Sequence, residues 1–125
     1  WGENSSDACR FANVADLAGK RQYGNWTGMH DCDDGSANTS PVGRYAANEH
    51  RIHDMLGNVW EWTCSRYQKN YDGSELRCVR ETFNGSPSLR GGSWTLGPNG
   101  TRSADRSSSA ADSRYFNFGF RVVRD

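Results

Sequence analysis

The sequence predicts one folded domain of the α+β class over residues 1–125, with little regular secondary structure and long ordered loops. Two observations point to this class. Leu, Ile, Val and Phe are scarce, so a large apolar core is not expected. Five Trp, five Tyr and five Phe nevertheless supply a small aromatic core. Fifteen basic and fifteen acidic residues cancel, and a balanced, aromatic-rich chain does not have the composition of a disordered one.

Few segments carry a periodic pattern, and each is short. Residues 1–50 are expected to be mostly loop, with one helix over 13–19, where an Asn can cap and a Gly can stop it. Residues 58–63 alternate polar side chains with Trp, which predicts a strand with one aromatic face. Two further strands are expected over 89–94 and 118–123. The aromatic core is expected to consist of Trp60, Trp62, Trp94 and Phe120.

Four cysteines form two sequence-local pairs without CxxC spacing, and the three histidines complete no zinc pattern. Because so thin a core needs covalent support, the favoured connectivity of the three possible is Cys9–Cys32 with Cys64–Cys78. Buried reduced thiols are the alternative. Disulfides would place the chain in an oxidising compartment: extracellular, at the cell surface or periplasmic.

Charge and hydropathy exclude two classes of partner. A chain with zero net charge has no overall field to attract nucleic acid or an anionic membrane. No apolar run approaches the length of a membrane-spanning helix. We therefore expect no nucleic-acid ligand and no membrane span.

The tail over residues 90–125 is the most informative segment. A Gly-Gly-Ser-Trp motif and an apolar Gly-Phe-Arg-Val-Val-Arg motif bracket a middle of small polar residues, Asn, Arg and aromatics. A segment that is fixed at both ends and adaptable between them suits a binding face. A long Gly- and Ser-rich surface loop is the alternative. The tail arginines could bind an anion or pack over aromatic rings; they are Arg102, Arg106 and Arg114.

Carboxylates and amides gather in two loop-rich places, around Asp31–Asp34 and around Asp54 and Glu61. Hard oxygen ligands on irregular backbone suit Ca²⁺, although solvated acidic turns have the same appearance. The sequence has no Gly-x-Ser-x-Gly, Walker or HExxH pattern, so it offers little evidence for a catalytic site. His50 and His53 lie beside carboxylates and could do acid–base work or form a surface turn.

An ordered set of motifs resembles the formylglycine-generating enzyme (sulfatase-modifying factor) family. The motifs are Gly-Asn-Val-Trp-Glu-Trp at 57–62, Arg-Gly-Gly-Ser-Trp at 90–94, Arg-Ser-Ala at 102–104 and Gly-Phe-Arg-Val-Val-Arg at 119–124. The resemblance implies a variant of the C-type lectin fold, a small twisted antiparallel sheet wrapped in long loops. It covers the later part of the family domain, so the expected domain is N-terminally incomplete, and a second chain could supply the rest.

The resemblance also implies two calcium sites. The first set is the Asn13 side chain, Val14 carbonyl, Asp34 side chain and Ser36 carbonyl. The second set is the Asp54 side chain, Gly57 carbonyl, Val59 carbonyl and Glu61 side chain. Each mixes carboxylate or amide oxygens with backbone carbonyls, as Ca²⁺ prefers.

The catalytic centre of the family does not carry over. Its enzymes oxidise a substrate cysteine with O₂, using two thiols that bind Cu(I) after the Gly-Gly-Ser-Trp motif, and a soft ion needs such ligands. Leu96 and Thr101 occupy those positions here, and no cysteine follows Cys78. Ser93 stands where the family has an active-site serine. The residues therefore leave enzyme activity undecided and favour a non-catalytic role.

The tail is also similar to the variable region of diversity-generating retroelement proteins. Adenine-directed diversification of Asn codons cannot produce Lys, Glu, Gln, Met or Trp, and residues 95–118 contain none of the five. Eleven tail residues are the predicted ligand contacts: Thr95, Leu96, Gly97, Asn99, Asp105, Ser107, Ser109, Ser113, Tyr115, Phe116 and Asn117.

Taken together, the sequence predicts a non-catalytic, calcium-stabilised module that binds a protein or glycan ligand, or assembles with another chain, through the polar and aromatic face of residues 95–118. Tyr115 and Phe116 are the expected anchors, because aromatics dominate binding energy. One alternative is an oxidoreductase of the same family with altered metal chemistry, using His50, His53 and Ser93. Another is an extracellular structural subunit that a partner chain completes.

Overall fold

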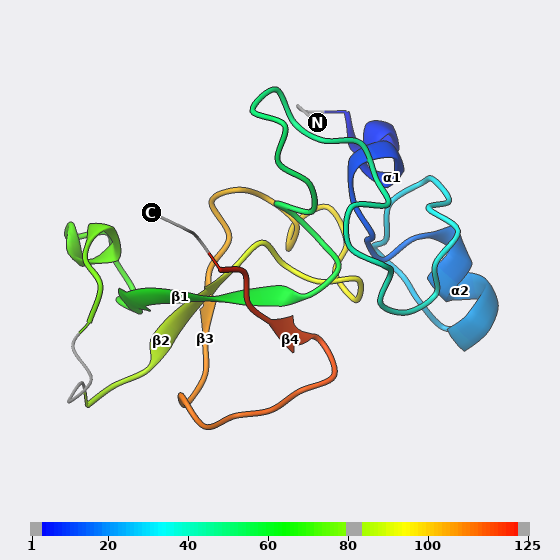
Figure 1. The fold of residues 1–125 in the computed structure, drawn as a ribbon. Coiled ribbons are helices and arrows are strands. Elements are labelled where there is room, and N and C mark those ends of the chain that lie inside the picture. Colours follow the sequence, from blue (N-terminus) through cyan, green and yellow to red (C-terminus); the bar gives the residue numbers. More distant parts are fainter. Residues whose placement is uncertain (1–3, 80–83, 123–125) are drawn as a thin grey trace.

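The computed structural model describes residues 4–79 and 84–122. Helices α1 and α2 lie at one side of the molecule and a small sheet occupies the other, with long loops joining them (Figure 1). No described helix is long and apolar enough to cross a membrane. The elements are η1 (Ser5–Asp7), α1 (Ala8–Phe11), α2 (Leu17–Tyr23), β1 (Trp60–Arg66), η2 (Ser74–Leu76), β2 (Pro87–Arg90), β3 (Ser107–Ser108) and β4 (Phe118–Gly119).

The sheet is mixed and has the strand order β3-β2-β1-β4. Strand β2 pairs antiparallel with both β1 and β3, but β4 runs parallel to β1, with Trp60 opposite Phe118. The expectation of an antiparallel sheet is therefore corrected at β4. Strand β3 lies within the tail and had no periodic signal, because two small serines are too short a run to show alternation.

The strand boundaries differ from the predicted ones at the glycines. Strand β1 begins at Trp60 rather than at residue 58, because Gly57 and Asn58 have positive φ angles of 77° and 56°, outside the strand region. Strand β2 ends at Arg90 because Gly91 and Gly92 also turn into positive φ. Residues 120–122 do not continue β4, and residue 123 lies outside the described residues.

The predicted helix over 13–19 is displaced along the chain. Helix α2 begins after Asp16, whose Oδ1 accepts hydrogen bonds from the N–H groups of Ala18 and Gly19, while Asn13 is buried outside the helix. Gly19 does not stop the helix but lies inside it, and a Cβ there would overlap the Trp26 ring. The helix ends at Gly24, with φ at 78°.

The aromatic core is partly as expected. Trp60 and Trp94 are buried, and Trp62 is half-buried with its ring edge against Phe118. Phe120 is wrong as a core residue, because its side chain is 75% exposed once the chain leaves β4. A second core packs Ala8, Ala12 and Val14 against the Cys9–Cys32 disulfide, a cluster too small to stand out in the sequence.

Both favoured cysteine pairings are present as disulfides, Cys9–Cys32 and Cys64–Cys78. The first joins α1 to the acidic turn that carries Asp34. The second fixes the end of β1 to the following loop, where Val79 N–H also donates to the Cys64 carbonyl at 2.7 Å. The disulfides therefore hold loops where the core offers little burial.

Candidate functional site

The first candidate metal set lies where three loops meet in the interior. Asp34 accepts hydrogen bonds from the Val14 N–H at 2.8 Å and from the Ser36 N–H at 2.7 Å. Asn13 Nδ2 donates to the Asn38 carbonyl at 2.7 Å, whereas Asn13 Oδ1 is buried and has no hydrogen-bond partner among the described residues. The structure thus brings all four residues together and leaves one buried amide oxygen available to a cation.

The pKa of Asp34 is shifted by its place in this set. Burial raises the pKa of Asp34 to about 6; the backbone donors Val14 and Ser36 oppose the rise, and the nearby Asp16 and Asp33 charges add to it. Burial disfavours the ionised form of this carboxylate, and a bound cation would stabilise that form.

Asp16 is a second buried carboxylate beside Asp34, and the sequence analysis did not single it out. Besides capping α2, it accepts the Asp34 N–H through Oδ2. The potential ligand atoms of Asp16, Asp34 and Cys9 lie within 4.8 Å of one another. The Cys9 sulfur is in a disulfide and offers no thiolate, so the metal-binding capacity here is that of oxygen ligands. An Asp just before a short helical run was the available signal.

The second candidate set surrounds Asp54 and Glu61. Asp54 has a φ of 55°, and its Oδ2 accepts the Gly43 N–H at 2.6 Å while its Oδ1 is buried without a described partner. Glu61 is already neutralised, because Arg121 donates to its two oxygens at 2.6 and 2.7 Å. That bond raises the pKa of Arg121. Arg121 also donates to the carbonyls of His53 and Asp54. The first set therefore fits a cation better than the second.

Asn58 connects the two sets. Its N–H donates to the Asn13 carbonyl at 2.7 Å, and its side chain bonds both the N–H and the carbonyl of Ser40. Gly57 must lack a side chain, because a Cβ would overlap the Asn13 carbonyl. The Gly-Asn pair, which favours positive φ, was the signal that could have identified this junction.

The tail is held at several points. Arg90 Nη1 donates to the carbonyls of Ser103 and Asp105, both at 3.3 Å, and β3 pairs with β2. The Asn117 carbonyl accepts the Trp60 N–H at 2.8 Å, beside the start of β4. The ends and one middle point are therefore fixed by backbone contacts that do not depend on the identity of most tail side chains.

Arg106 packs as a structural cation. Its guanidinium lies 3.9 Å from the Tyr71 ring centroid and 5.3 Å from that of Tyr67, and Nη2 donates to the Lys69 carbonyl at 3.1 Å. These aromatic partners come from the loop after β1 rather than from the tail. Arg106 is thus a clamp on the tail and not a free anion-binding group.

None of the eleven predicted ligand residues is fully buried. Asn99, Tyr115 and Phe116 are exposed, and the side chains of the two aromatics are 59% and 71% accessible. The half-buried members are Thr95, Leu96, Gly97, Asp105, Ser107, Ser109, Ser113 and Asn117. The structure therefore presents the segment as a surface with a polar and aromatic character.

The positions of the family copper thiols hold a packing and hydrogen-bonding site instead. Thr101 is buried, and its hydroxyl bonds His30 Nε2 at 2.9 Å; burial lowers the pKa of His30. Leu96 is half-buried against Gly100, and Ser93 is buried with its hydroxyl 2.9 Å from that of Thr95. All four cysteines are in disulfides, so no thiolate is available to bind Cu(I).

The histidines of the alternative enzymatic interpretation do not assemble into a centre. His50 is exposed and pairs only weakly with Glu49, at 3.7 Å. His53 is exposed and its Nδ1 contacts the Tyr45 carbonyl at 2.7 Å. Among the described residues, neither belongs to a group of three potential metal ligands.

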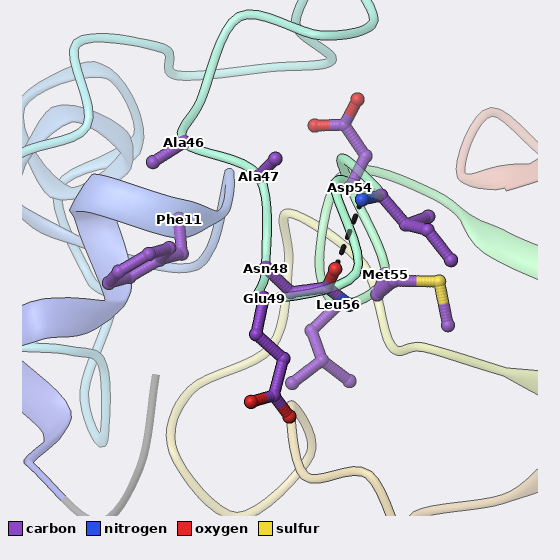
Figure 2. Close-up of a pocket in the computed structure, with 9 residues that line it drawn as sticks. Phe11, Ala46, Ala47, Asn48, Glu49, Asp54, Met55 and Leu56 are labelled. Carbon is purple, nitrogen blue, oxygen red and sulfur yellow. Dashed lines mark hydrogen bonds between the residues drawn. The ribbon is translucent and has the colours of Figure 1, made fainter.

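A pocket of about 420 Å³ lies between Phe11 of α1 and the loop that precedes β1. Figure 2 shows Phe11 on one side and Leu56 and Met55 on another, with the carboxylates of Glu49 and Asp54 pointing in opposite directions. Carboxylates arranged in this way do not form an acid–base pair. The pocket is an apolar recess beside the second metal set.

A second cavity, of about 470 Å³, is an open aromatic groove that the sequence analysis missed. The rings of Tyr23, Trp26 and Trp94 stack with centroids 5.3–6.0 Å apart, and Phe116 lies 5.8 Å from Trp94 at a tilted angle. The lining residues within the described part of the chain are Tyr23, Trp26, Asn38, Thr39, Trp94, Thr95 and Phe116. Tyr23 and Trp26 carried no periodic signal, because they lie at and beyond the end of a short helix.

Comparison with known proteins identifies the family to which this architecture belongs. The Sulfatase-modifying factor enzyme 1-like domain family matches residues 4–125. The formylglycine-generating enzyme of Mycobacterium tuberculosis is 36% identical over 103 residues, which cover 73% of this chain and 34% of that protein. The inactive C-alpha-formylglycine-generating enzyme 2 of Mus musculus is 35% identical over 97 residues, covering 73% and 28%. The chain thus spans about a third of the length of these relatives.

Two solved structures share the fold. PvdO from Pseudomonas aeruginosa matches with a TM-score of 0.68 and 28% identity, over 90% of this chain and 38% of that one. Treponema denticola variable protein 1 matches with a TM-score of 0.60 and 17% identity, over 91% and 36%. The fold expected from the sequence motifs is confirmed, and the chain belongs to the family of sulfatase-modifying factor enzyme 1-like domains, to which the formylglycine-generating enzymes are related.

Proposed function

We propose that this chain is a non-catalytic binding module of the formylglycine-generating-enzyme type, whose ligand face is the segment 95–118. The observation that carries the proposal is a contrast between the positions of the family's copper ligands, where the thiols are missing, and the adjoining tail, which keeps an exposed surface. The two copper-thiol positions are Leu96 and Thr101, and Thr101 is committed to a buried hydrogen bond with His30. The adjoining tail nevertheless remains fixed at its ends and exposed in Tyr115 and Phe116.

Ca²⁺ would stabilise the loops beneath this face. Asn13 and Asp34, with the carbonyls of Val14 and Ser36, would hold the ion, and the unpartnered Asn13 Oδ1 and the raised pKa of Asp34 support that assignment. Asp54 and Glu61, with the carbonyls of Gly57 and Val59, form the second set. Its Glu61 would have to be shared with Arg121.

The ligand face is tested by selection followed by substitution. A peptide and a glycan library are panned against the wild-type protein, and each recovered ligand is titrated against a Tyr115→Ala/Phe116→Ala variant and against Phe120→Ala. Phe120 is the matched control, because it is 75% exposed and lies outside the segment. We expect roughly a tenfold or greater loss in the double variant only. Ligands that bind all three proteins equally would place the binding face elsewhere.

Diversification of the tail is a finer form of the same proposal. The absence of Lys, Glu, Gln, Met and Trp from residues 95–118 supports it. The coding DNA for residues 90–125 should then differ between cells of one population at template-adenine positions between codons 95 and 118. An invariant tail would leave a fixed ligand face and remove diversification.

The compartment and the partners follow from the same proposal. Two disulfides favour an extracellular, cell-surface or periplasmic location. The partner would be a protein or glycan rather than nucleic acid, because the net charge is zero.

A structural subunit completed by a partner chain is the second candidate. A groove of about 480 Å³ is bordered by Val42, Ile52 and Phe120, which are 87%, 40% and 75% exposed. Such an apolar surface suits a protein contact. Phe120→Ala would then reduce co-purification of a stoichiometric second chain while Phe116→Ala would not, and the opposite pattern would reject this candidate.

A further inference from the structure

We propose that the aromatic groove binds an uncharged, proline-rich segment in the extended polyproline conformation. The inference rests on the proposed binding function and specifies a ligand class for one part of the face. It adds Tyr23, Trp26 and Asn38, which lie outside the tail, to the contacts expected from Trp94 and Phe116.

The groove is aromatic and neutral. No Asp, Glu, Lys, Arg or His lines it. A charged ligand group buried there would lose its hydration without gaining an ionic partner, which is costly. Aromatic-lined grooves are the surfaces that recognise polyproline segments, which enter already extended and therefore lose little conformational entropy.

The groove offers a side-chain amide donor at Asn38, to which a ligand carbonyl can bind. Tyr23 OH donates to Asn38 Oδ1, which orients the amide and leaves Asn38 Nδ2 without a partner among the described residues. Proline has a carbonyl but no N–H, so a proline-rich segment supplies acceptors without adding donors.

The rings are held in place before any ligand arrives. Gly19 lets the Trp26 ring pack directly on α2, because any side chain there would overlap it. Trp26 in turn contacts both Tyr23 and Trp94, which also contact each other. A preorganised groove loses little side-chain entropy on binding, which favours affinity from a small contact area.

The test uses the whole chain and three defined probes: a blocked, uncharged peptide of consecutive prolines, a Gly/Ser peptide of equal length, and a neutral oligosaccharide. Binding is followed by Trp fluorescence and by NMR shifts of the Trp26 and Trp94 indole N–H signals. We expect saturable shifts with the proline peptide and none with the Gly/Ser peptide. Equal binding of the two peptides, or shifts with the oligosaccharide alone, would overturn the proposal.

Three substitutions locate the site. Phe116→Ala should weaken binding of the proline peptide roughly tenfold, and Tyr23→Phe, which keeps the ring but frees the Asn38 amide, several-fold. Phe120→Ala should leave the affinity unchanged. An unchanged affinity in Phe116→Ala would also overturn the proposal. Failure of the proline peptide would not affect panned ligands that depend on Tyr115 and Phe116, so the two proposals fail separately.

Discussion

The loops around Asn13 and the tail over 95–118 are both irregular, but the two regions are built differently. Around Asn13 the side chains are buried and most polar atoms have a specific partner, as Asn58 has in Asn13 and Ser40, whereas Asn13 Oδ1 has none among the described residues. Along the tail the fixed contacts are made by backbone groups, by Arg90 from outside it, and by the side chains of Thr101 and Arg106, which are not among the eleven predicted ligand residues. Irregular structure can therefore serve either as a rigid support or as an adaptable surface, depending on which atoms hold it.

The largest expected difference lies between two glycines with nearly the same φ angle. Gly57 and Gly43 have φ angles of 77° and 75°, but a Cβ overlaps the Asn13 carbonyl only at Gly57. Gly43→Ala should cost about 1–2 kcal/mol from left-handed strain alone. Gly57→Ala should cost about 3 kcal/mol or more, because overpacking adds to the strain. Urea unfolding measures both, and equal losses would show that the Asn13 junction is not rigid.

Calcium should stabilise the loops around Asn13, which form the rigid support, and leave the tail over 95–118 unaffected. At a Ca²⁺ concentration about 100 times the Kd, the gain is about 2.7 kcal/mol, or on the order of 10 °C in Tm over the chelator-treated protein. Asp34→Asn should abolish the part of the gain that comes from the first set. Asp33→Asn, which changes an exposed neighbour paired with Arg21, should keep it. A Tm that does not respond to Ca²⁺ in the wild type would remove the ion from the account.

The metal-free support should also respond to pH. The folded pKa of Asp34, about 6, lies above its ordinary value of 3.8, so the folded state binds the proton more tightly than the unfolded state. This contribution to stability is therefore full below about pH 4, declines as the pH rises to about 6, and is lost above that. Urea unfolding with chelator at several pH values measures it. Asp34→Asn should flatten that part of the profile, whereas a steeper profile would contradict the assignment.

The smallest expected effects are in the tail. Ser107→Ala, Ser113→Ala and Phe116→Ala should each change the free energy of unfolding by no more than about 0.5 kcal/mol, because these side chains are exposed or half-buried. Thermal unfolding of the three variants checks this. Losses comparable to that of Gly57→Ala would show that the tail is part of the support.

The same contrast explains what the sequence could predict. Motif order identified the fold, and the two sequence-local cysteine pairs identified the disulfide partners, since both depend on residue types at fixed positions. Phe120 was misplaced because alternation predicts a strand face but not where the strand ends. The aromatic groove and Asp16 could not be found, because their neighbours come from distant loops whose approach leaves no periodic signal in the chain.

The most direct test of the account is a displayed library in which the eleven tail positions are varied together, scored for protease resistance and then for ligand binding. A matched library varies eleven of the buried positions that lie between residues 12 and 58. The account predicts that most tail variants resist protease like the parent and yield new binding specificities, whereas most variants of the matched library unfold. Equal loss of folded protein in the two libraries would contradict it.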